Sequence, residues 1–298
     1  MAIPESQLNT WSSQGSIIQS KNTYGSVKSA LEQGKAAYSD RAFEVFLQGS
    51  YGNDTNVYAE SDVDTVIRLD SIMRSDLSAL SPEQQEAYHA TYANATYTFK
   101  EFKNGVASRL ADSFGAAQVS PGDRAFHIKP NGGRRSADVV ACYQYRRYTR
   151  FASENDQHYF PGIIICGTSK GDIINYPKLH SRGVTTKHQA TNGWLKPTIR
   201  IFKNLRNRLI EIGTIAEDTA CSYYIEGMLY NVPPENFRAD YGTTFCNAVN
   251  WLLKVDRSKL ICPHGQHLLL GSANVQWEPA QCAVFLDQLV NLWNNWNS

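Results

Sequence analysis

Three aspartates and a glycine-serine pair are the residues of this 298-residue chain whose types and spacing point to chemistry. Asp62 and Asp64 stand two positions apart in an alternating run, and Asp138 opens a second apolar run. Side chains at positions i and i+2 of a strand point to one face, so the first two carboxylates can share divalent cations. Carboxylate oxygens are ligands that Mg²⁺ prefers, with phosphates supplying others.

Gly49-Ser50 precedes the aspartates and supplies the other half of a phosphoryl-transfer site. Gly49 lets the backbone approach a ligand closely, and Ser50 offers a hydroxyl and an amide to terminal phosphates. Two cations about 3.5–4 Å apart would stabilise the attacking and leaving oxygens. Aspartates also cap turns at strand entries, but the combination with Asp138 favours a metal-dependent transfer from a nucleoside triphosphate.

The composition predicts a globular protein with a sizeable core. Hydrophobic residues make up 42%, charged residues 19%, and the formal net charge is +1, which argues against a protein that coats nucleic acid. The apolar stretches are too short to cross a bilayer, and residues 1–16 lack an apolar signal region, so we expect a cytoplasmic protein. The six cysteines stand singly, without the pairs that indicate a disulfide framework or a zinc ribbon.

Patterning predicts the elements that must position these residues, with a mixed α/β region followed by a helical one. We expect helices over 16–37 and 81–114, and helical structure from about 192 to the end, closing with 279–296. We expect strands over 43–47, 62–69, 118–129 and 136–148, and a hairpin of 162–166 with 172–176. In the strand 62–69 the odd-numbered positions should share one face, and Asp62, Asp64, Val66 and Arg68 the other. Ser81-Pro82 is typical of a helix start.

A basic stripe marks the first long helix of the second region. Lys196, Arg200 and Lys203 lie beside an apolar stripe, and Ser222-Tyr223 follows at the start of another apolar helix. For Lys196 and Arg200, a solvent-facing role explains the pattern equally well. An ammonium, a hydroxyl and an aromatic ring are the groups that a triphosphate tail and a base require.

These motifs together resemble the CD-NTase family, the bacterial relatives of cyclic GMP–AMP synthase and oligoadenylate synthase. The resemblance covers residues from about 15 to 260. The matching segments are Gln48-Gly49-Ser50-Tyr51, Ser61-Asp62-Val63-Asp64, Asp138, the connector Asn175 to His180, the helix Ile199 to Arg206, and Ser222 to Glu226 with Leu229 to Pro233.

The resemblance implies an α+β, bilobal enzyme whose active site lies between the lobes. The polymerase-β-like nucleotidyltransferase lobe, a mixed sheet with helices, would span 1–178 with an N-terminal spine helix, and a helical nucleotide-binding lobe would span 179–298. Such enzymes join ribonucleoside triphosphates into a cyclic di- or trinucleotide in anti-phage CBASS systems, where the product activates a separate effector protein.

Carried over by position, the resemblance assigns roles to individual residues. Asp62 and Asp64 would hold two Mg²⁺ ions, with Mn²⁺ as the alternative, and Asp138 would hold one ion and help to deprotonate the attacking hydroxyl. Tyr223 would stack on a base. The residues expected to contact substrate besides Tyr223 are Gln48, Gly49, Ser50, Lys203 and Ser222.

Two alternatives concern the reaction, and a further question is whether DNA activates the enzyme. The carboxylates serve any attacking hydroxyl, so an enzyme that modifies an RNA, a protein or a small molecule fits them too. A catalytically silent nucleotide sensor would not need three clustered acids. The animal synthase carries a zinc ribbon for DNA sensing. Cys262, His264 and His267 lack the spacing of common zinc motifs, so we expect no DNA activator.

Overall fold

One mixed sheet carries the three predicted aspartates on or beside its central strands. The computed structural model describes residues 2–14, 17–58, 62–169, 171–238 and 240–296. Within these residues the strands are hydrogen-bonded in the order β1-β2-β5-β4-β3, with β6 paired to β5 and β7 to β6. The strands are β1 (Phe43–Leu47), β2 (Val63–Asp76), β3 (Val119–Pro121), β4 (Phe126–Ile128), β5 (Ala137–Ser153), β6 (Asp156–Ile165) and β7 (Ile173–Asn175).

Strands β2 and β5 run parallel, with Val63 opposite Ala137 and the register continuing to Leu69 opposite Tyr143. The other neighbouring pairs are antiparallel. Every second residue of β2 from Val63 to Leu69 is buried, and on the other face Val66 is buried while Asp64 and Arg68 are partly exposed. Asp64 therefore belongs to the opposite face.

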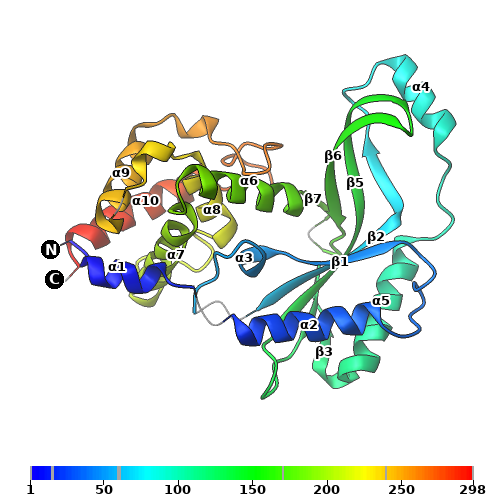
Figure 1. Ribbon diagram of the computed structural model, residues 1–298, viewed down its shortest axis with the longest axis horizontal. Helices are drawn as coiled ribbons and strands as arrows, with labels where there is room; N and C mark the ends of the chain where they lie inside the picture. Colours follow the sequence, from blue (N-terminus) through cyan, green and yellow to red (C-terminus); the bar gives the residue numbers. More distant parts are fainter. Residues whose placement is uncertain (1, 15–16, 59–61, 170, 239, 297–298) are drawn as a thin grey trace. The chain divides into compact units, whose positions relative to one another are not determined.

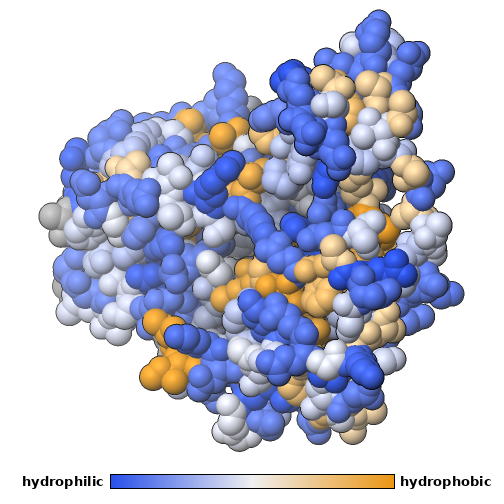
Figure 2. Space-filling model, turned by 45° about the vertical axis from the view of Figure 1, so that its right-hand side comes forward, coloured by the Kyte–Doolittle hydropathy of each residue, from blue (hydrophilic) through white to orange (hydrophobic). Residues whose placement is uncertain are grey.

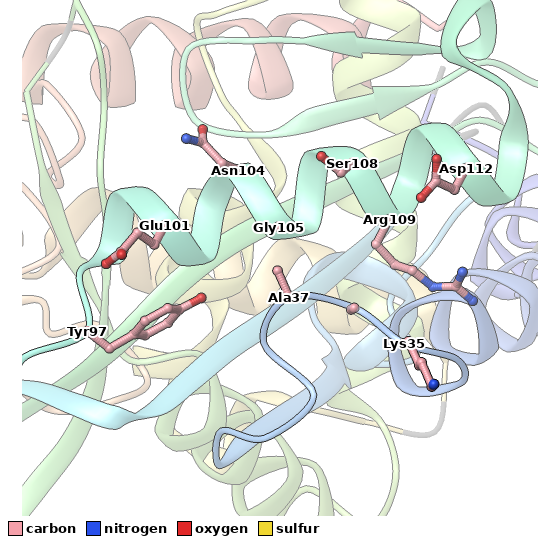
Figure 3. Close-up of a pocket in the computed structure, with 10 residues that line it drawn as sticks. Lys35, Ala37, Tyr97, Glu101, Asn104, Gly105, Ser108, Arg109 and Asp112 are labelled. Atoms are coloured by element: carbon pink, nitrogen blue, oxygen red, sulfur yellow. The ribbon is translucent and has the colours of Figure 1, made fainter.

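Helices α2 (Ile18–Glu32) and α5 (Phe99–Phe114) pack against each other and against the sheet (Figure 1). The Arg109 side chain of α5 ties them together, because it donates to Ala30 O and Gln33 O, each at 2.6 Å. These bonds satisfy carbonyl groups at the end of α2 that have no partner within the helix. Beside them lies a cavity of about 470 Å³, in which Tyr97 and Arg109 flank the loop at Ala37 (Figure 3).

The helix predicted over 81–114 is wrong as a single element, because the chain forms two helices there. Helix α4 (Pro82–Thr91) begins at the predicted Ser81 cap, whose hydroxyl accepts from Gln84 N. The backbone is extended at Tyr92, and α5 begins afresh after Thr98. Thr98 and Glu101 form a reciprocal capping box, which stabilises a new helix start.

The strand predicted over 118–129 is also wrong, because it consists of two short strands. β3 and β4 form a hairpin, and Gly122 N donates to Ala125 O at 2.7 Å in its turn. The predicted hairpin of 162–166 with 172–176 is confirmed as β6 and β7, although β6 begins earlier, at Asp156. The helix predicted from 16 is α2, which ends at Glu32, and residue 16 lies outside the described part.

Contacts divide the chain into two compact units. The sheet unit comprises Ile18–Gln48 and Ser61–Pro177, and the helical unit comprises Met1–Ile17, Gly49–Glu60 and Lys178–Ser298. This division differs from the predicted one in 1–17 and 49–60, which group with the C-terminal helices. Leu8 of the first segment is fully buried in the core of the helical unit, and Asp54 of the second pairs with Lys196 at 2.9 Å.

The helical unit has a large apolar core, including Phe202, Trp277 and Phe285. The predicted helical character beyond 192 holds for four long helices and fails between them. Residues 255–278 are irregular, with isolated bridges such as Ile261 to Leu268. The helices are α1 (Glu5–Ser12), α3 (Gly49–Gly52), α6 (Pro177–Ala190, whose first residue still belongs to the sheet unit), α7 (Leu195–Glu211), α8 (Ser222–Asn231), α9 (Tyr241–Lys254) and α10 (Pro279–Asn294).

The face of the molecule drawn in Figure 2 is mainly polar. On the face drawn in Figure 2, hydrophilic residues cover most of the area and apolar ones gather in smaller patches. Among the described residues, no helix combines the length and the apolar character that crossing a bilayer requires.

Candidate active site

The three aspartates fall on one face of the sheet at neighbouring positions. Asp64 on β2 is the direct partner of Asp138 on β5. Asp62 immediately precedes β2, and its Oδ1 accepts a hydrogen bond from the Ser136 hydroxyl. Ser136 precedes Asp138 by two residues, as Asp62 precedes Asp64. The carboxylates therefore lie together at the N-terminal ends of two parallel strands.

A histidine that the sequence analysis missed extends this row. His127 on β4 is the register partner of Asp138, and its Nδ1 lies 3.0 Å from Asp138 Oδ1. Both side chains are accessible, Asp138 at 35% and His127 at 42%. The signal in the sequence was the alternation of Phe126 and Ile128, both buried, around a polar residue.

The donor set fits a hard divalent cation, because it consists of carboxylate oxygens on one accessible face. Within the part of the chain that the structure describes, no group of three or more Asp, Glu, His or Cys side chains is placed so that it could hold a metal ion by itself. Asp62 and Asp138 instead engage Ser136 and His127. A site in which the protein supplies only some of the ligands suits a catalytic ion that takes the others from substrate and water.

The Gly49-Ser50 segment forms the one-turn helix α3 rather than an open turn. Gly49 has φ +68°, a conformation that favours glycine. The turn is closed by Asn53 N donating to Gly49 O at 3.1 Å and by Thr55 N donating to Ser50 O at 2.9 Å. Preceding it in the sheet unit, Gln48 N donates to Asp64 O at 3.0 Å.

Lys203 of α7 is fully buried, which the sequence analysis did not foresee. Its ammonium nitrogen lies 3.3 Å from Glu226 Oε1 and donates to the Thr55 hydroxyl at 3.3 Å. Glu226 Oε2 accepts from Asn53 Nδ2 at 2.9 Å and lies 2.8 Å from His180 Nε2. This set of Asn53, Thr55, His180, Lys203 and Glu226 is called the Glu226 network below.

Electrostatics within the Glu226 network favour the charged carboxylate. Burial disfavours ionisation of Glu226, but the Lys203 charge, the His180 contact and the Thr55 hydrogen bond outweigh it and lower its pKa to about 2. Glu226 is therefore an anion throughout the working pH range of most enzymes. Its presence beside Lys203 could not be read from the sequence, since the two residues belong to different helices.

Ser222 and Tyr223 open helix α8, as predicted. Arg206, one turn after Lys203 on α7, donates to the Ser222 hydroxyl at 3.1 Å and to Ala220 O at 3.2 Å. Arg206, Cys221 and Ser222 line a cavity of about 490 Å³. Arg206 was named in the sequence analysis only as part of a matching helix, and the structure places its guanidinium beside a predicted substrate contact.

The Tyr223 side chain is contacted on one face of its ring and at its hydroxyl. It stacks on His180 with ring centres 4.9 Å apart at 25°, and its hydroxyl lies 2.9 Å from His264 Nε2. Burial, followed by the nearby histidines His267 and His180, lowers the pKa of His264 to about 3, so this ring is neutral near pH 7. Because Gln266 N donates to His264 Nδ1, Nε2 carries the proton and donates to Tyr223.

Lys196 and Arg200 do not face solvent, so that interpretation of the basic stripe is wrong. Lys196 pairs with Asp54 at 2.9 Å, and Arg200 donates to Asp54 O at 2.6 Å and to Ser12 O. The two cations hold the 49–60 segment and α1 onto α7. In the Cys262 to His267 segment, Cys262 is buried and its thiol donates to Leu268 O.

Comparison with known proteins decides the family. A family model described as the cGAS/DncV-like nucleotidyltransferase C-terminal helical domain matches residues 182–294. The cyclic UMP-AMP synthase of Rhodothermus marinus is 39% identical over 297 residues, covering 99% of each chain. The chain belongs to the CD-NTase family. Cyclic nucleotide synthase CdnE01 of Staphylococcus haemolyticus is 36% identical, over 99% of this chain and 100% of the relative.

Solved structures agree with this assignment. The Rhodothermus marinus CdnE c-UMP-AMP synthase with Apcpp and Upnpp superposes with a TM-score of 0.89, covering 99% of this chain and 98% of that one at 39% identity. The Elizabethkingia meningoseptica CdnE cyclic dinucleotide synthase with GTP and Apcpp gives 0.77 at 26% identity, covering 99% and 100%. This CD-NTase is a nucleotidyltransferase of polymerase-β-like fold, so the predicted family, fold class and enzyme class are confirmed.

Proposed function

We propose that this CD-NTase joins two ribonucleoside triphosphates into a cyclic dinucleotide and releases pyrophosphate. The full-length relatives named above are cyclic nucleotide synthases, and other relatives of at least 30% identity make cyclic dipyrimidine or dipurine nucleotides. The UMP-AMP, dipyrimidine and dipurine products share a two-nucleotide ring and differ in the bases. The product serves as a second messenger in anti-phage defence, where it acts on a separate effector protein.

The observation that carries this proposal is the placement of Asp64 directly opposite Asp138 on parallel strands, with Asp62 on the same face. A binding protein without catalysis gains nothing from such a row, because neighbouring carboxylates repel one another. A phosphoryl-transfer enzyme needs it to offset the charge of a triphosphate.

Divalent cations, when bound, offset the phosphate charge and lower the pKa of the attacking hydroxyl. We infer that Asp62 and Asp64 hold two Mg²⁺ ions and that Asp138 holds one of them, with Mn²⁺ as the alternative ion. Asp138 also accepts the proton of the ribose hydroxyl. His127, which contacts the Asp138 carboxylate, fixes the orientation of that carboxylate for this step.

The helical unit supplies the contacts to the nucleotide. Ser50 offers its hydroxyl and amide to the terminal phosphates, with Gln48 and Gly49 shaping the segment that presents it. Lys203 and Ser222 bind the triphosphate, and the ring of Tyr223 stacks on a base. Stacking on an aromatic ring is worth about 1–3 kcal/mol per base and tolerates different bases.

The test is incubation of the protein with the four ribonucleoside triphosphates and Mg²⁺, followed by phosphatase treatment and mass spectrometry. We expect pyrophosphate release and a phosphatase-resistant product with the mass of two nucleotides joined in a ring. For aspartate variants of the site, Asp112→Asn on the exposed surface of α5 serves as the matched control and retains full activity. Transfer that occurs only when an RNA, protein or small-molecule acceptor is added would replace cyclisation with acceptor modification.

A further inference from the structure

Glu226 is a buried anion in the core of the helical unit. It is 3% exposed, and the residues around it on α8 from Ile225 to Leu229 are buried as well. Charged carboxylates are seldom buried unless paired, because desolvation costs more than one ion pair returns. An apolar residue at this position would serve packing equally well or better. The carboxylate therefore calls for a role that packing does not supply.

The partners of Glu226 come from three other segments of the helical unit. Asn53 and Thr55 directly follow α3, which carries Ser50. Lys203 lies on α7, and His180 lies on α6. One carboxylate group thus joins the loop after α3 to helices α6, α7 and α8.

Each of these segments bears or contacts a residue that the proposed function assigns to the nucleotide. Thr55 N closes the turn on Ser50 O at 2.9 Å, so holding Thr55 holds Ser50. His180 forms the surface on which the Tyr223 ring stacks. Lys203 is itself a proposed triphosphate contact.

We propose that Glu226 is a positioning residue that sets the geometry of the triphosphate-binding and base-stacking groups of the helical unit. This inference rests on the proposed function. Glu226 orients Lys203 through their ion pair, holds Ser50 through Thr55 and Asn53, and holds Tyr223 through His180. It does not touch the nucleotide, so its removal acts on nucleotide binding through the residues that it orients.

The decisive variant is Glu226→Gln, which keeps the shape of the side chain and removes its charge. We expect the KM for nucleotide to rise about tenfold or more, with a smaller fall in kcat, because hydrogen bonds to charged groups are the strong ones. Glu235→Gln, an exposed residue of the same unit, is the matched control with unchanged KM. A role in stability alone would lower the melting temperature and the active fraction, and would leave KM unchanged.

Thr55→Val provides a second test that keeps the Lys203–Glu226 ion pair and the Asn53 contact, and removes the Thr55 hydroxyl with its hydrogen bonds to Glu226 and Lys203. We expect KM to rise in this variant too, at near wild-type melting temperature. If Glu226→Gln does not fold, Thr55→Val decides the matter. An unchanged KM in Thr55→Val, or in folded Glu226→Gln, overturns the inference. The proposed function still stands in that case if the wild-type protein synthesises a cyclic product. Absence of cyclic product from the wild type overturns both.

Discussion

The buried charge of Glu226 makes a quantitative prediction about stability and pH. Its pKa is about 2 in the folded chain, compared with an ordinary value of 4.5. Because the folded-state pKa is the lower one, the carboxylate contributes stability at pH values above 4.5 and loses it as the pH falls towards 2. At about 1.36 kcal/mol per pH unit, this difference corresponds to about 3 kcal/mol at pH 7.

The assay is denaturant unfolding of the wild type and Glu226→Gln at pH values from 3 to 7. The difference between the two free energies of unfolding isolates this site, since the other acids titrate in both proteins. We expect the wild type to be more stable by about 3 kcal/mol at pH 7 and by only about half as much at pH 3. Lys203 and His180 face the carboxylate in the wild type.

A difference between the two proteins that stays constant from pH 7 to pH 3 would refute this reasoning. It would mean that the variant loses packing or hydrogen bonds and that the charge itself contributes nothing. A wild type no more stable than Glu226→Gln at pH 7 would have the same consequence.

Other variants and conditions test the remaining assignments. The double variant Asp62→Ala with Asp64→Ala abolishes turnover, measured as pyrophosphate release, and retains the wild-type circular dichroism spectrum; normal product yield would contradict the assignment. Tyr223→Ala reduces activity more than Tyr223→Phe, because the ring face acts on the base; the reverse order would point to the hydroxyl that contacts His264. Lys203→Ala raises KM more than it lowers kcat, and also destabilises the fold by about 3–5 kcal/mol because Glu226 loses its partner. Excess chelator stops synthesis, and added Mg²⁺ restores it.

Local periodicity accounts for the parts of the fold that were predicted correctly. Alternation over residues 62–69 separated the two faces of β2 and placed Asp62 and Asp64 on the same one. The partnership with Asp138 depended on pairing two strands more than seventy residues apart. The need of a two-cation site for a third carboxylate from a neighbouring strand, rather than periodicity, suggested that pairing.

Tertiary contacts account for most of what the sequence analysis missed. Lys203 and Glu226 meet because α7 and α8 pack together, and no local sequence pattern predicts a buried ion pair. Lys196 and Arg200 appeared as a solvent-facing stripe because their partners lie in 1–17 and 49–60. The break between α4 and α5 had a local signal, the Thr98 capping box, which the helical periodicity of the flanking residues concealed.

The central claim is that Asp62, Asp64 and Asp138 jointly hold divalent cations, and a crystal soaked with Mn²⁺ and a non-hydrolysable triphosphate tests it most directly. Anomalous scattering should show two manganese peaks about 3.5–4 Å apart. Both should lie against Asp62 and Asp64, and one against Asp138. Manganese bound elsewhere on the chain, with these three carboxylates free of it, would contradict the account.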